Sequence, residues 1–200
     1  QGDPAPMLLS PQGTHVAVGD HDTGGADLAV VDLRTGHSTV HPLPAGRSIV
    51  PLAWSPDGKQ VAYQFSAEPT NPYGGFPITG DVGLLDPQTG IAEALPGASN
   101  VKTAAFSPDG TELALQQGLF GGTLEVVSLV GDSPRVVQAP GGELDGPAAW
   151  SPDGLLLATT EVDTCRYPEL GRPCVGDRTE ISFADATGQG RRVPDPLPVD

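Results

Sequence analysis

The two cysteines are the most reactive side chains of the sequence, and they lie close together. Cys165 and Cys174 are separated by eight residues, most of them turn-forming or polar. The ends of such a loop can meet, and a disulfide there would stabilise the chain by roughly 2 to 3 kcal/mol. We therefore expect a disulfide, which favours an oxidising compartment. Two free thiols are the alternative, and a metal site is disfavoured because no third or fourth Cys or His lies nearby.

The four histidines all fall in the first 41 residues, at positions 15, 21, 37 and 41. We expect them on different strands and loops, with His37 and His41 exposed. No cysteine or carboxylate cluster completes a site around them. The sequence also lacks the Gly-x-Ser-x-Gly, Walker A and His-Glu-x-x-His motifs. These observations predict a protein that is not an enzyme.

Two loops carry side chains suited to recognition. Tyr73 and Phe76 lie among glycines and prolines in residues 69–77, and Phe120 lies between glycines in residues 118–122. Exposed aromatic rings on semi-rigid loops suit binding. The alternative is that these rings fold down and cover the strands beneath them.

An acidic segment at residues 19–27 offers a weak candidate for a cation site. Asp20, Asp22 and Asp27 supply carboxylates, but the segment lacks a full ladder of oxygen ligands and a closing bidentate Glu. A polar hairpin loop explains the segment equally well, so we expect neither a metal nor another cofactor.

Charge and hydropathy exclude two classes of partner. The net charge is -15, with no cluster of Lys or Arg, so nucleic acid is not expected to bind. The acidic residues are spread along the chain, as on an ordinary solvated surface. No run approaches the roughly 20 apolar residues of a membrane helix, so no membrane insertion is expected of this segment.

One five-residue motif recurs four times, and the repeats that it marks must position the residues described above. Its serines stand at positions 10, 55, 107 and 151, so the repeats are about 45 to 52 residues long. The four copies are Leu9-Ser10-Pro11-Gln12-Gly13, Trp54-Ser55-Pro56-Asp57-Gly58, Phe106-Ser107-Pro108-Asp109-Gly110 and Trp150-Ser151-Pro152-Asp153-Gly154.

The motif has the composition of a tight turn. Proline presets φ, aspartate bonds to its own backbone, and glycine accepts a left-handed conformation. The three serines of the Ser-Pro-Asp-Gly copies are therefore interpreted as structural residues and not as nucleophiles. Trp54, Phe106 and Trp150 precede these turns and are expected to be buried at equivalent positions.

The apolar residues around each turn alternate with the period of strands. In the second repeat we expect strands at 51–54, 60–63, 81–85 and 91–94, and in the third at 101–106, 112–115, 123–128 and 135–137. A second turn phrase, such as Asp32-Leu33-Arg34-Thr35-Gly36 or Asp86-Pro87-Gln88-Thr89-Gly90, joins the last two strands of a repeat.

Together these motifs resemble the WD-like β-propeller repeats of the TolB family, over essentially the whole chain. The resemblance implies an all-β fold of four blade-like repeats with four antiparallel strands each, in one domain spanning 1–200. Blades are expected at about 7–40, 51–94, 101–137 and 146–193. Propellers of this type usually have six or more blades, so three alternatives remain: a piece of a longer propeller, a four-bladed ring, or two chains that complete one ring.

The resemblance specifies a fold and leaves function open. We expect an extracytoplasmic propeller, secreted, periplasmic or anchored at the cell surface, that binds a protein or another envelope ligand. The alternative is the non-catalytic propeller portion of a larger secreted peptidase or other hydrolase. Because the Ser-Pro-Asp-Gly turns are short and uniform, binding is expected on the opposite face, where the loops are long and dissimilar.

Overall fold

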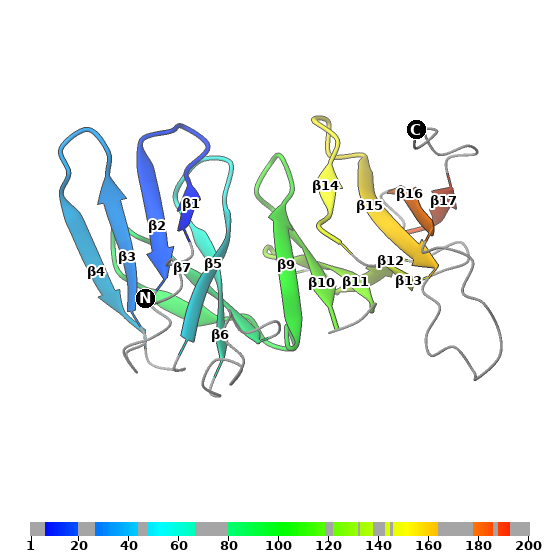
Figure 1. Ribbon diagram of the computed structural model, residues 1–200, viewed down its shortest axis with the longest axis horizontal. Coiled ribbons are helices and arrows are strands. Elements are labelled where there is room, and N and C mark those ends of the chain that lie inside the picture. The colour runs from blue at the N-terminus through cyan, green and yellow to red at the C-terminus, as the bar shows by residue number, and fades with distance from the viewer. Residues whose placement is uncertain are drawn as a thin grey trace.

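The computed structural model of the chain describes residues 7–19, 27–43, 48–66, 80–118, 122–131, 133–137, 143–144, 146–163, 178–185 and 188–192. Every named element within these ranges is a β-strand, and the strands form four antiparallel sheets that follow one another along the chain. No helix in these ranges is long and apolar enough to span a membrane. Figure 1 shows the sheets side by side in chain order, with the first and the last at opposite ends.

We call the four sheets blades 1 to 4. Blade 1 contains β1 (Met7–Leu9), β2 (His15–Gly19), β3 (Asp27–Asp32) and β4 (Ser38–Pro42). Blade 2 contains β5 (Ser48–Trp54), β6 (Val61–Ser66), β7 (Asp81–Leu85) and β8 (Ala92–Ala94). Blade 3 contains β9 (Val101–Phe106), β10 (Glu112–Gln117), β11 (Leu124–Ser128) and β12 (Arg135–Val137). Blade 4 contains β13 (Glu143–Leu144), β14 (Ala149–Trp150), β15 (Leu156–Asp163), β16 (Arg178–Asp185) and β17 (Gly190–Arg192).

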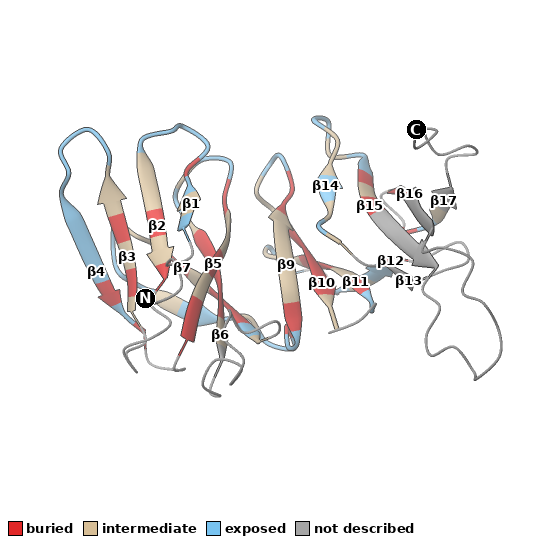
Figure 2. Cartoon of the chain, in the orientation of Figure 1, coloured by how far each residue is buried: buried red, intermediate tan, exposed pale blue. Residues whose placement is uncertain are grey.

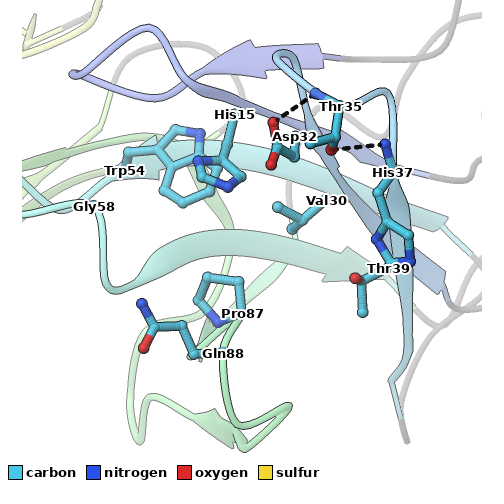
Figure 3. A pocket seen from close by; sticks show the side chains of 10 residues that line it. All are labelled: His15, Val30, Asp32, Thr35, His37, Thr39, Trp54, Gly58, Pro87 and Gln88. Carbon is cyan, nitrogen blue, oxygen red and sulfur yellow. Dashed lines mark hydrogen bonds between the residues drawn. The ribbon is translucent and has the colours of Figure 1, made fainter.

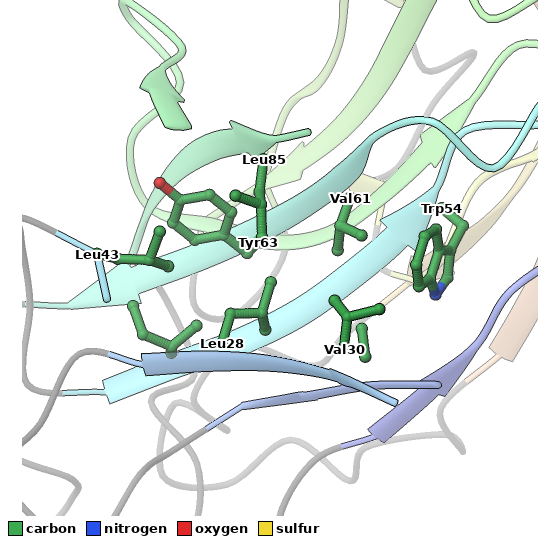
Figure 4. Close-up of a cluster of buried hydrophobic side chains, with 9 residues drawn as sticks. Leu28, Val30, Leu43, Trp54, Val61, Tyr63 and Leu85 are labelled. Atoms are coloured by element: carbon green, nitrogen blue, oxygen red, sulfur yellow. The ribbon is translucent and has the colours of Figure 1, made fainter. Parts of the chain in front are cut away.

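Consecutive blades pack face to face, because alternate residues of a strand point to opposite sides of its sheet. In β6, Val61 and Tyr63 belong to the apolar cluster shared with blade 1 (Figure 4). Ala62, between them, belongs to the cluster shared with blade 3. A third cluster joins blades 3 and 4 and includes Leu124 and Leu157. Figure 2 shows buried residues along β2, β3, β5, β9 and β10 and exposed residues in the turns.

Two tryptophans tie neighbouring blades together through hydrogen bonds. The indole Nε1–H of Trp54 donates to the backbone oxygen of Leu8 in blade 1 over 3.0 Å. At the equivalent position of blade 4, Trp150 donates to the backbone oxygen of Ala105 in blade 3, also over 3.0 Å. Phe106 occupies this position in blade 3, and a phenyl ring has no N–H to donate.

The expected burial of these three aromatic residues is correct for two of them. Trp54 and Phe106 are 7% and 8% exposed, whereas Trp150 is only half-buried. The reason is the length of the supporting strand. Trp54 ends a strand of seven residues, while Trp150 ends a strand of two residues, which leaves the Trp150 ring with less cover.

Candidate functional site

In the turns between the first two strands of each blade, the polar side chains form hydrogen bonds within the turn itself. In blade 2 the Ser55 hydroxyl donates to Asp57 Oδ1 over 2.8 Å and accepts the backbone N–H of Gln60 at 2.9 Å. Asp57 also accepts the backbone N–H of Lys59 at 3.1 Å, and Gly58 has a φ of 74°. The same bonds recur in blades 3 and 4. The structure thus places these serines within hydrogen-bonded turns.

The turn aspartates are held in their charged form. In blades 2, 3 and 4 the serine hydroxyl is the main cause that lowers the pKa of Asp57, Asp109 and Asp153. In blade 1 the aspartate is replaced by Gln12, and Ser10 Oγ alone accepts the backbone N–H groups of Thr14 and His15, at 3.2 and 3.0 Å.

A cavity of about 560 Å³ opens between blades 1 and 2 (Figure 3). Most of its lining residues belong to the ends of the strands where the tight turns lie, and we call this side of the molecule the turn face. Blade 1 supplies one wall and blade 2 the other. The lining residues are His15, Val30, Asp32, Thr35, His37, Thr39, Trp54, Gly58, Pro87 and Gln88.

The apolar part of the cavity is continuous with the core between the two blades. Val30 and Trp54 both belong to the shared apolar cluster, with 6% and 7% of their surface exposed. Pro87 adds a rigid apolar ring from the turn between β7 and β8. The cavity therefore offers an apolar wall that the fold itself holds in place.

The polar part is supplied mainly by two histidines of blade 1. His15 Nδ1 lies 2.9 Å from the hydroxyl of Thr14, and the backbone N–H of His37 donates to Thr35 Oγ1 at 3.2 Å. Neither of these contacts uses the Nε2 atom of a ring, so each imidazole retains hydrogen-bonding capacity. Gln88 contributes an amide from the opposite wall.

Asp32 lines the same cavity but is engaged by its own turn. Its Oδ1 accepts the backbone N–H groups of Arg34 and Thr35 at 2.8 and 3.0 Å. These backbone hydrogen bonds, with that from Thr35 first, lower the pKa of the Asp32 carboxyl. Asp32 is therefore a fixed negative charge beside the cavity and a poor proton acceptor.

Both histidines occupy positions where the other repeats carry different residues. His15 lies five residues after the turn serine, and the equivalents are Gln60, Glu112 and Leu156. His37 directly follows the glycine of the second turn, where blades 2 and 4 carry Ile91 and Gln189. The fold of a blade thus does not require histidine at either position.

The corresponding space between blades 2 and 3 has a different character. A cavity of about 360 Å³ lies there, and its lining residues are Ser55, Pro56, Asp57, Lys59, Gln60, Asp86, Pro108, Asp109 and Gly110. Three carboxylates and one ammonium group dominate it, and no aromatic ring lines it. The two cavities show that the same repeat builds chemically different spaces.

The structure agrees with one expectation about the histidines and corrects another. His15 lies in β2 and His37 directly before β4, in line with the expected different strands and loops, and the packing of blade 1 on blade 2 brings both to one cavity. His41 was expected to be exposed and is only 7% exposed. His41 lies in β4, opposite Leu28 of β3. Its ring is next to Gly90 of blade 2, since a Cβ built on that glycine would lie 3.5 Å from His41 Nδ1. Burial lowers the pKa of His41.

Most of the other residues singled out in the sequence lie outside the described ranges. These are Tyr73, Phe76, Phe120, Cys165, Cys174, Asp20 and Asp22, so the aromatic loops and the disulfide remain predictions. Asp27 is described and begins β3. Within the described ranges no group of three or more His, Cys, Asp or Glu is placed to hold a metal ion.

Comparison with known proteins establishes the fold. TolB from Acinetobacter baumannii matches 95% of this chain with a TM-score of 0.63 and 19% identity, over 43% of its own length. The Cps50 (Swd1) β-propeller domain of Myceliophteria thermophila matches 93% with a TM-score of 0.63 and 15% identity, over 53% of its length. An oligogalacturonate lyase solved in complex with manganese matches 96% with a TM-score of 0.64 and 18% identity, over 54% of its length.

These similarities support a TolB-like β-propeller fold for the chain, which spans about half the length of the solved structures it matches. No protein family profile and no curated protein matches the sequence.

Proposed function

We propose that the chain is a non-enzymatic β-propeller that binds a protein or another ligand at the cell envelope. We also propose that the cavity between blades 1 and 2 receives one group of that partner. The observation that carries this proposal is the meeting of His15 and His37 in one cavity. Repeats that share a fold need the same residues for folding, so residues found in one repeat alone are candidates for recognition.

The lining of the cavity suggests the kind of group it takes. Trp54, Val30 and Pro87 offer apolar surface, while the imidazoles and the Gln88 amide offer donors and acceptors. Binding pockets commonly combine an apolar lining with a few polar groups that fix orientation. The combination suits a peptide segment with an apolar side chain next to a polar backbone or side-chain group.

The long loops on the opposite face form the second part of the proposal. Tyr73 and Phe76 are the aromatic residues we expect to contact a partner there, with Phe120 on a neighbouring loop. An experiment can separate the contribution of the loop face from that of the cavity.

Selection of binding peptides from a displayed random peptide library provides the probe. The selected peptides are titrated against the wild type, a His15→Ala/His37→Ala variant and a Tyr73→Ser/Phe76→Ser variant. Ile91→Ala is the matched control, because Ile91 occupies the His37 position in blade 2 and is 59% exposed. We expect the histidine variant to bind at least tenfold more weakly, about 1.4 kcal/mol.

The outcomes separate the two faces. If only the Tyr73→Ser/Phe76→Ser variant loses affinity, the cavity is not the contact site and the loop face is. If both folded variants bind every selected peptide as the wild type does, neither surface is the binding site.

A second function is the alternative, and one of the matching structures is an enzyme, an oligogalacturonate lyase. The chain would then be the non-catalytic propeller portion of a larger secreted peptidase or other hydrolase, in which it positions the substrate. A hydrolase domain with a Gly-x-Ser-x-Gly motif in the same gene would select this alternative.

The extracytoplasmic location depends on the cysteines. We expect a disulfide between Cys165 and Cys174, because they share one loop and no other thiol is present. A thiol titration of the denatured, unreduced protein should find no free thiol. Two free thiols would contradict both the disulfide and the location inferred from it.

A further inference from the structure

The alanine seven residues after each turn serine shows how the blades approach one another. The four repeats all carry alanine there, at positions 17, 62, 114 and 158. Ala17, Ala62 and Ala114 are completely buried, and each belongs to a blade that is followed by another blade. Ala158 of blade 4 is only half-buried. A small side chain kept at a position of close approach indicates that something packs against Ala158 as well.

Two apolar residues beside Ala158 on this face of blade 4 are also open to solvent, and Asp185 lies on the same face, opposite Leu156. Phe183 lies opposite Ala158 in the neighbouring strand and is 36% exposed. Leu156 is 46% exposed and replaces the Gln60 and Glu112 of the preceding repeats. We call Leu156, Ala158 and Phe183 the trailing face, because the equivalent face of every other blade lies against the next blade.

The opposite end of the arc shows the complementary face on blade 1. Ala17, Leu28 and Val30 point towards blade 2, so the alternate residues of the same strands point away from it. These are also apolar, and we call them the leading face: Met7, Leu9, Val16, Val18, Ala29, Val31 and Val40. Met7, Leu9 and Val40 are 68%, 56% and 55% exposed.

An apolar residue at nearly every position on both sides is the pattern of a sheet covered on both faces. An antiparallel sheet with one solvated face normally alternates apolar and polar residues. Leu9 also occupies the position of Trp54, Phe106 and Trp150, each of which packs against the preceding blade. Blade 1 therefore presents the face with which the other blades bind their predecessors.

The trailing face and the leading face are the two halves of a contact that the chain already makes three times. Any second copy of the chain brings both halves. We propose that two copies associate head to tail, the trailing face of each against the leading face of the other, and close into a ring of eight blades.

Two features of propellers support a closed pair. Closed propellers typically contain four to eight blades, and two four-bladed arcs reach the upper end of that range. A head-to-tail contact closes only when its rotation returns to the start, and otherwise forms an open chain. Closure buries all four exposed faces of the pair and leaves no open sheet face. This inference is independent of the proposed binding function.

The mass of the protein in solution provides the test. Sedimentation equilibrium at micromolar concentrations should give twice the 20.5 kDa of one chain. Leu9→Asp on the leading face and Phe183→Asp on the trailing face should each raise the dissociation constant at least a hundredfold. Leu156→Asp is a second variant of the trailing face, in case Phe183→Asp fails to fold. Val130→Asp is the control, because Val130 is 72% exposed and lies on neither face.

Mixing the variants identifies the direction of the contact. In a mixture of Leu9→Asp and Phe183→Asp chains, one intact trailing face can meet one intact leading face. Heterodimers should therefore form where neither variant dimerises alone. Circular dichroism and thermal melting must show that all variants are folded.

Three results would overturn the proposal. A wild type that stays monomeric at tens of micromolar would exclude the second copy as the occupant of these faces. Dimers that survive Phe183→Asp would show a contact between like faces. A mass that keeps growing with concentration would show that the contact does not close.

Discussion

The junction between blades 1 and 2 and the junction between blades 2 and 3 are built from the same sheets and turns, yet they differ in chemistry. At the first junction Trp54 adds a hydrogen bond across the blades; at the second Phe106 packs without one. The first junction encloses about 560 Å³ beside two histidines, whereas the second encloses about 360 Å³ among carboxylates. The comparison teaches that the repeat fixes the backbone, while a few variable positions decide what each junction can bind.

The strongest way to break the first junction is to remove its aromatic anchor. Trp54→Ala removes a ring that is 7% exposed and should lower the free energy of unfolding by ~3 to 5 kcal/mol in urea titrations. Trp54→Phe places the residue of the second junction in the first and should cost less than Trp54→Ala, because it loses one hydrogen bond, about 1 kcal/mol, and only part of the buried ring. A loss below about 1 kcal/mol for Trp54→Ala would contradict the packing described here.

A smaller effect is expected from the turn that borders the second junction. Ser55→Ala removes a buried hydroxyl and leaves the backbone N–H of Gln60 without its acceptor. The expected loss is about 1 to 3 kcal/mol at neutral pH. Equal stability of the variant and the wild type would show that water replaces the hydroxyl without cost.

The same variant predicts a dependence on pH. Ser55 is the main cause of the lowered pKa of Asp57, and a carboxyl with a lowered pKa stabilises the fold above its unfolded value of 3.8. That contribution is lost as the pH falls through the folded pKa. The stability difference between wild type and Ser55→Ala should therefore stay constant from neutral pH down to the unfolded pKa of 3.8 and narrow as the pH falls below it. A difference that stays constant below that pH would contradict the assignment.

The smallest effect concerns the polar link across the first junction. Gln12 takes the place of the turn aspartate in blade 1, and its Nε2 donates to the backbone oxygen of Pro56 in blade 2 at 2.9 Å. Because this hydrogen bond is exposed, Gln12→Ala should cost only about 0.5 to 1 kcal/mol. Asp109→Ala is the matched change at the equivalent position of blade 3. A loss above about 2 kcal/mol for Gln12→Ala would mean that this hydrogen bond stabilises the fold more than an exposed hydrogen bond does.

The sequence predicts the strands well because strand period and turn composition are local properties. The strands expected at 81–85, 101–106 and 135–137 occur with those bounds, and the others in blades 2 and 3 differ by one to three residues at an end. The all-β fold of four four-stranded sheets follows from the same patterns. The first strand of blade 4 differs, since it is split into β13 and β14.

The candidate site could not be predicted in the same way, because it depends on contacts between blades. His15 and His37 are 22 positions apart, and only the packing of β2, the turn after β3 and blade 2 around one space brings them together. The burial of His41 has the same origin. The confinement of all four histidines to one repeat was a signal in the sequence, but it did not show which of them would meet.

Each apolar cluster in this molecule is shared by two consecutive blades, and this has a consequence for the order in which the chain unfolds. A blade that detaches takes half of a core with it, so the loss of one blade weakens its neighbour directly and more distant blades only through that neighbour. In an unpaired chain, amide hydrogens of blades 2 and 3, which are held from both sides, should exchange with solvent more slowly than those of blade 1 and blade 4. The smallest fragment able to hold its structure is then a pair of adjacent blades, since a single sheet has no core of its own.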